Sequence, residues 1–153
     1  MTMFFLMNEP GGVENLPSLN FTQEWNEAER LGIQTMDVDP LPDWVSAYWA
    51  DTPDDTFRDF RMVDIDGLTG VRWHRWWLNG NGTLEQSDED TFTYTEPESD
   101  VAPYKGMMMN AIWYIPRYEH LNISCQLTTE VHIIPDHYPI PPCVGAECRG
   151  ELV

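Results

Sequence analysis

The stretch VRWHRWWLNGNGTLEQ, residues 71–86, decides the fold class of this chain. Residues 71–78 are rich in the aromatic side chains that strands favour, and NGNG at 79–82 is a turn sequence of the kind that joins antiparallel strands. Residues 83–86 then predict the next strand. Together with a preceding strand at 57–65, the stretch predicts a three-stranded antiparallel meander.

The alternation of period two continues through the rest of the chain. Further strands are predicted at 91–95, 107–115 and 122–134, joined by loops at 97–106 and 116–120. At 153 residues the chain is long enough for one domain with a proper core, which its seven Trp, six Tyr and six Phe supply. We therefore expect a mainly β fold, an antiparallel β-sandwich or barrel.

Two short helices are expected before the sheet. At 22–31, a threonine can cap the first turn and Gly32 can end the helix. At 42–50, apolar residues that include Trp44 and Tyr48 recur at spacings of three and four. Both apolar stripes are interpreted as core-facing.

The two ends of the chain are interpreted as extended arms around a single domain at 19–134. The N-terminal arm, residues 1–18, is broken by proline and glycine over most of its length. The C-terminal tail, residues 135–153, is rich in proline and is expected to run extended without ladder hydrogen bonds.

The charge inventory restricts the partners of the protein. There are 26 Asp and Glu against eight Lys and Arg, and the formal net charge is −18. A surface of this sign repels phosphate backbones and anionic lipid headgroups, so no nucleic acid is expected as a partner. Four arginines between residues 58 and 75 lie among aromatic residues. Their pairing with carboxylates and aromatic faces is favoured over stacking on nucleic-acid bases.

The single lysine, Lys105, makes the composition unusual as well as acidic. An acid-rich and lysine-poor composition is similar to that of proteins from salt-loving archaea and from the viruses that infect them. This similarity predicts a high-salt environment. An ordinary acidic protein is the alternative interpretation.

The strand expected at 71–78 carries aromatic residues on both faces. Trp73 and Trp77 point to one face, whereas His74 and Trp76 point to the other. A strand with one solvated face would alternate with polar residues. Three interpretations stay open, namely core packing on both faces, a protein interface anchored by tryptophan, and a surface that stacks on sugar rings.

Three cysteines and two histidines are weak candidates for a metal site. They are Cys125, His132, His137, Cys143 and Cys148. Thiolate and imidazole ligands suit zinc, but the spacing matches no zinc finger or ribbon. Cys143 and Cys148 bracket a flexible loop that can close a disulfide in an oxidising setting. No metal and no cofactor is therefore predicted.

The sequence contains no local pattern of nucleophile, base and orienting group, so the chain is not expected to be an enzyme. No stretch approaches the roughly 20 apolar residues that a membrane-spanning helix needs. The apolar opening MTMFFLM lacks a basic region and a cleavage site, so it does not predict a usual secretory signal.

The apolar and proline-rich arms indicate an element of a larger assembly. We expect a structural subunit of a virion or extracellular particle. Its role would be that of a capsid, decoration or tail protein. The acidic composition makes a halophilic archaeal virus one candidate for the virus. The expected partners are other protein subunits, in a homo- or hetero-oligomer. The alternative is a monomeric β module that binds carbohydrate or protein. The expected interface anchors are Phe4, Phe5, Leu6, Trp76, Trp77, Pro139, Ile140, Pro141 and Pro142.

Overall fold

The computed structural model describes residues 16–52, 60, 70–78, 80, 83–115 and 123–135, and this part of the chain is mainly β and contains no helix. The strands are β1 (Ser18–Asn26), β2 (Leu31–Asp39), β3 (Trp44–Asp51), β4 (His74–Trp77), β5 (Leu84–Gln86), β6 (Thr91–Pro97), β7 (Lys105–Tyr114), β8 (Ser124–Thr128) and β9 (His132–Ile134). The prediction of a mainly β, antiparallel fold is confirmed.

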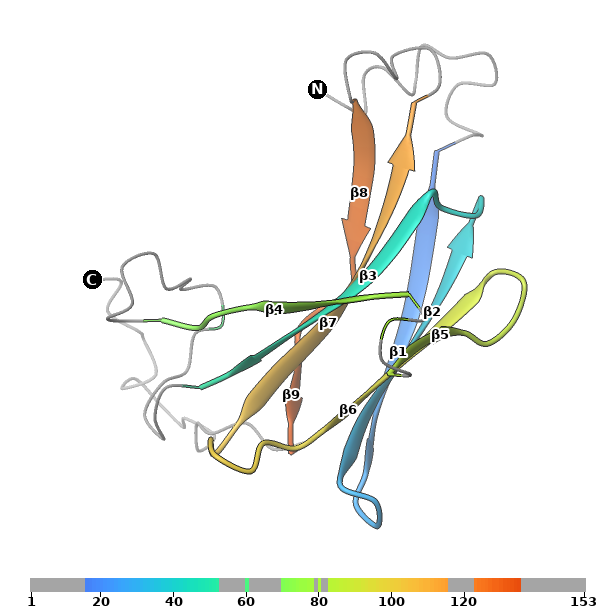
Figure 1. Ribbon diagram of the computed structural model, residues 1–153. Helices are drawn as coiled ribbons and strands as arrows, with labels where there is room; N and C mark the ends of the chain where they lie inside the picture. Colours follow the sequence, from blue (N-terminus) through green and yellow to red (C-terminus); the bar gives the residue numbers. More distant parts are fainter. Residues whose placement is uncertain are drawn as a thin grey trace, which may run out of the picture.

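The strands form two antiparallel sheets in a sandwich-like arrangement (Figure 1). The four-stranded sheet has the order β1-β2-β6-β5, and the five-stranded sheet has the order β4-β3-β7-β8, with β9 also paired to β7. β7 is the longest strand and lies inside the five-stranded sheet, with β3 on one side and β8 and β9 on the other. β4 forms the edge beyond β3.

The core lies between the two sheets because side chains alternate between the faces of a strand. β2 contributes Met36 and Val38 to it, and β7 contributes Met107, Met109 and Ala111. The two sheets approach closely at one glycine. A Cβ on Gly32 would lie 2.6 Å from the sulfur of Met107, so no larger residue fits there without movement.

A β-bulge divides the strand that the sequence predicts at 122–134 into β8 and β9. Asn110 pairs with Thr128 and Met107 pairs with His132, so two residues of β7 face three residues of the opposite strand. Thr129 holds the bulge with two hydrogen bonds. Its N–H donates to the Met109 carbonyl over 3.0 Å, and its hydroxyl accepts from the Met109 N–H over 2.8 Å.

The helix expected at 22–31 is wrong, because this segment forms the hairpin between β1 and β2. Phe21 and Trp25 share a strand face and pair with Met36 and Gly32. A spacing of four residues is even, so it satisfies both the helical period and the strand period. The threonine expected as a helix cap stands inside β1, and the hairpin loop is stabilised by Asn26, whose side-chain oxygen accepts the N–H groups at positions 28 and 29.

The helix expected at 42–50 is also wrong, because this segment is strand β3. Trp44 and Tyr48 are again four residues apart and lie on one strand face. Val45 and Ala47 point to the opposite face and are buried in the core. Pairing with β4 on one side and β7 on the other satisfies the backbone of β3, so the tertiary sheet overrides the local helical pattern.

The strands expected at 83–86, 91–95 and 107–115 correspond to β5, β6 and β7. The expected meander is wrong, because β4 pairs with β3 whereas β5 pairs with β6 in the other sheet. The turn after β4 therefore connects the two sheets and does not close a hairpin. The strand expected at 57–65 lies outside the described residues, apart from Phe60.

Candidate binding surface on the five-stranded sheet

The outer face of the five-stranded sheet gathers aromatic side chains from three neighbouring strands. Trp44 of β3 pairs with Ile112 of β7, and Tyr48 of β3 pairs with Arg75 of β4. Trp77 lies two residues after Arg75, so it shares the same face. Because the opposite face of β3 and β7 fills the core, these side chains point away from the second sheet.

A pocket of about 290 Å³ opens on this face, and we call it the aromatic pocket. Its lining residues are Trp44, Arg75, Trp77, Ile112 and Tyr114. Trp44 is 52% exposed, Trp77 49% and Tyr114 39%, which makes them three of the five most exposed large apolar residues among those described. The rings of Trp44 and Trp77 meet edge to face at 69°, with their centroids 6.1 Å apart. The pocket is therefore an aromatic corner and not a flat platform.

Arg75 is the cation of the aromatic pocket, and its neighbours hold it in place. Its guanidinium carbon lies 3.7 Å from the ring centre of Trp77 and 5.5 Å from that of Tyr48. One guanidinium N–H group donates to the hydroxyl of Ser46 over 3.2 Å. The expectation that arginines lie over aromatic faces is met at this residue.

Asp43 positions the rim of the pocket with one backbone and one side-chain hydrogen bond. The Asp43 N–H donates to the Ile112 carbonyl over 2.9 Å, and its carboxylate accepts the Tyr114 N–H over 2.7 Å. These two bonds extend the β3–β7 ladder by one residue before the start of β3. They fix Tyr114 at the end of β7 on the side of the pocket next to Trp44.

Of the expected interface anchors, the structure places Trp77 in the aromatic pocket and Trp76 on the inner side of the sheet. Trp76 is partly buried against the core, and its ring centroid lies 6.4 Å from that of Trp49. The anchors Phe4, Phe5, Leu6, Pro139, Ile140, Pro141 and Pro142 lie outside the described residues. The sequence missed Trp44 and Tyr114 as surface residues, because Trp44 was assigned to a core-facing helix.

The candidate metal ligands are not assembled into a site in the described part of the chain. Cys125 is a buried free thiol on β8, and burial raises its pKa above the usual range. His132 is buried on β9. His137, Cys143 and Cys148 lie outside the described residues. Among the residues that are described, no group of three His, Cys, Asp or Glu is arranged to hold a metal ion.

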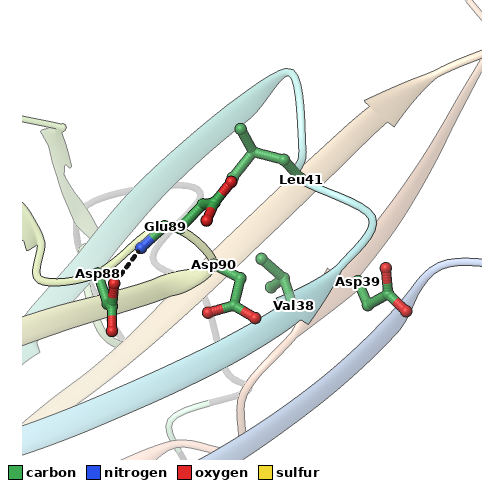
Figure 2. Close-up of a pocket in the computed structure, with 6 residues that line it drawn as sticks. All are labelled: Val38, Asp39, Leu41, Asp88, Glu89 and Asp90. Atoms are coloured by element: carbon green, nitrogen blue, oxygen red, sulfur yellow. Dashed lines mark hydrogen bonds between the residues drawn. The ribbon is translucent and has the colours of Figure 1, made fainter.

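A second pocket, of about 420 Å³, lies where the end of β2 meets the loop before β6 (Figure 2). It is lined by Val38, Asp39, Leu41, Asp88, Glu89 and Asp90. Figure 2 shows its four carboxylates spread along the pocket and not gathered around one point. Asp88 accepts the N–H of Glu89 over 2.8 Å, which is a local turn contact. The pocket is thus an acidic loop surface.

The only lysine of the chain is buried in a polar network between the sheets. Lys105 donates to Glu96 over 2.9 Å and to the carbonyl of Pro97 over 2.8 Å, and its amine lies 4.9 Å from the ring centre of Trp49. The Tyr94 hydroxyl donates to the other oxygen of Glu96 over 2.7 Å. Burial, reinforced by the Glu96 charge, raises the pKa of Tyr94 well above its ordinary value of 10.0. The Lys105, Glu96 and Tyr94 side chains are thus paired with one another, whereas the buried indole N–H of Trp49 beside them has no hydrogen-bond partner among the described residues. We interpret the network as structural.

Comparison with protein families, with curated proteins and with solved structures finds no match for this chain. No helix in the described ranges is long and apolar enough to cross a membrane.

Proposed function

We propose that this protein is a structural subunit of a larger assembly and that the aromatic pocket is a contact surface for other protein subunits. The observation that carries the proposal is the composition of the pocket: two Trp, one Tyr and one Arg among the five described residues that line it. These three residue types are enriched at the centres of protein interfaces, because Trp and Tyr bury large areas and Arg adds a charge with several hydrogen-bond donors.

The contrast between the two outer faces supports this proposal. On the four-stranded sheet, Thr22, Thr35 and Thr93 lie side by side across β1, β2 and β6, as expected for a solvated face. None of the described residues that line the aromatic pocket carries a carboxylate, although the chain has 26 Asp and Glu. Acidic residues keep the remaining surface soluble, whereas the pocket gains free energy when a partner covers it.

We take a virion as the assembly, in the role of a capsid, decoration or tail protein, because the sequence has an apolar N-terminal arm and a proline-rich C-terminal tail. The proposed location is accordingly a virion or extracellular particle. Lys105 is buried, so the exposed Lys and Arg side chains among the described residues belong to arginines. A strongly acidic surface without exposed lysine is similar to that of halophilic proteins, which supports a halophilic archaeal virus as one version of the proposal.

Sedimentation velocity of the full chain tests the proposal. We expect association that increases with protein concentration at about 0.15 M and about 3 M salt, because the contact is apolar and surface charges are screened at both. The paired substitution Trp44→Ala and Trp77→Ala should leave a folded monomer. Val101→Ala is the matched control, because Val101 is 88% exposed and lies outside the pocket. Equal association of the paired variant and the wild type would refute the proposal.

A monomeric module that binds carbohydrate is the second candidate, because two exposed tryptophans are available for stacking on sugar rings. Against it, the indole rings are tilted by 69° and the Arg75 guanidinium lies over Trp77. A shift in tryptophan emission with an oligosaccharide, in a protein that sediments as a monomer, would favour this candidate. No response across a glycan panel would eliminate it.

A further inference from the structure

We propose that the aromatic pocket binds the proline-rich segment at 139–142 of a second copy of this chain. This inference rests on the proposed function, because it names the partner of the same pocket. The segment reads Pro139-Ile140-Pro141-Pro142 and belongs to the C-terminal tail, which lies outside the described residues. The contact joins the pocket of one subunit to the tail of the next.

The shape and chemistry of the pocket suit a proline-rich ligand. Segments with prolines at the first and fourth positions form an extended left-handed helix that docks into aromatic-lined grooves. Here Trp44 and Trp77 supply a corner that can hold one pyrrolidine ring, and Ile112 and Tyr114 continue the apolar lining. Because proline is already restricted, such a segment loses little entropy on binding.

The charges of the pocket and the tail are complementary. Of the described residues that line the pocket, Arg75 is the only charged one, and one of its N–H groups is used by Ser46. Its remaining donors can reach backbone carbonyls, which an extended proline-rich helix leaves free. Residues 135–153 contain three carboxylate side chains and one arginine, so the tail is attracted to this cation.

The reach of the chain favours a contact between two copies over a contact within one subunit. The tail leaves β9 at Ile134, which pairs with Lys105 at the opposite end of β7 from the pocket. Ile112 lies seven residues further along β7, a distance of about 23 Å at strand rise. Pro139 is five residues beyond Ile134, and five extended residues span at most about 18 Å. Pro139 of a subunit therefore cannot reach Ile112 of its own pocket, whereas the tail of a second copy has no such limit.

A pocket on one subunit and a tail from the next make a head-to-tail interface. Such heterologous contacts close into rings or continue as filaments, depending on the rotation between neighbours. Rings and filaments are both assemblies that a structural subunit can build. The inference therefore gives the proposed assembly a specific connection between its subunits.

Sedimentation velocity with two complementary variants tests the inference. One variant carries Trp77→Ala in the pocket, and the other carries alanine in place of Pro139, Pro141 and Pro142 in the tail. We expect the wild type to form a series of oligomers and each variant alone to sediment as a monomer. An equimolar mixture should form dimers and nothing longer, because only one working pocket meets one working tail.

A peptide titration supplies an independent measurement on the intact protein. The probe is a synthetic peptide of residues 136–146 with Cys143→Ser. We expect a blue shift of tryptophan emission as the exposed rings lose water, and an affinity at least about tenfold weaker for the Trp77→Ala protein. A peptide with alanine at positions 139, 141 and 142 is the control.

The outcomes distinguish this inference from the proposed function. If the tail variant associates as the wild type does while Trp77→Ala stays monomeric, the pocket binds something else and only the inference fails. A mixture of the two variants that stays monomeric, or no peptide binding up to about 1 mM, also overturns the inference. If Trp77→Ala itself associates like the wild type, the proposed function fails.

Discussion

Replacing Lys105 with methionine should be among the most destabilising single changes in this protein. Methionine keeps the apolar stem of the side chain but removes the amine that contacts Glu96 and the Pro97 carbonyl. The side chains of Lys105 and Glu96 are only 8% and 6% exposed, so water cannot replace the lost partner. The variant leaves a carboxylate in the core with the Tyr94 hydroxyl as its remaining hydrogen-bond donor.

The size of the effect follows from the burial of the pair. Removing one partner of a buried ion pair typically costs about 3–5 kcal/mol. We therefore expect a loss in this range. With a urea slope of about 2 kcal/mol per molar, the unfolding midpoint falls by about 2 M.

Urea unfolding followed by tryptophan fluorescence and circular dichroism measures this loss. The double variant Lys105→Met with Glu96→Gln should recover much of the stability, because the buried charge is then absent and the amide still accepts the Tyr94 hydrogen bond. Arg30→Met is the matched control. It removes the other described ion pair, between Arg30 and Glu98, but Arg30 is exposed, so the midpoint should hardly move.

Two results would refute this reasoning. The first is a loss below about 1 kcal/mol for Lys105→Met, which is the scale of an exposed ion pair. The second is a double variant no more stable than the single one. Either result would mean that the Glu96 carboxylate reaches water in solution.

Three further measurements follow from the described contacts. Gly32→Ala should cost about 1–3 kcal/mol, measured by urea unfolding, because its Cβ would lie 2.6 Å from the sulfur of Met107. An unchanged midpoint would mean that the sheets separate freely at this point. The raised pKa of Tyr94 means that the folded state holds the phenol proton more tightly than the unfolded state. Stability from this group is therefore fully present below pH 10.0 and declines above it, and Tyr94→Phe should flatten that decline in thermal unfolding. Cys125 is buried and the pKa of its thiol is raised, so in a variant with the other two cysteines changed to serine, iodoacetamide should label it only in urea. Rapid labelling of the native protein at pH 8 would contradict its burial.

The strand content was predictable where one face of a strand is uniformly apolar. In β7, Met107, Met109, Ala111 and Trp113 alternate toward the core, and this pattern is visible in the sequence. β2 was missed because its inner face carries Gly32 and Gln34 beside its two apolar residues. A buried glutamine is stable there because its amide donates to the Glu130 carbonyl over 3.0 Å, a contact far away in the sequence.

Only part of the candidate site could be predicted from the sequence. Trp77 was a candidate because aromatic residues at 71–78 fall on both strand faces. The sequence could not choose between Trp76 and Trp77, because the choice depends on which face the second sheet covers. Trp44 and Tyr114 join the site only through the pairing of β3 with β7.

The sequence by itself determined the net charge, the β class and the positions of several strands. These properties depend on charge counts and on a period of two, which are local. Only the tertiary structure decided that β4 and β5 belong to different sheets, that 22–31 is a β-hairpin and 44–51 a strand, and that an aromatic pocket faces outward. The physical reason is that a strand has two faces and two edges. Its sequence groups the side chains by face, but distant strands decide which face is buried and which edge is paired.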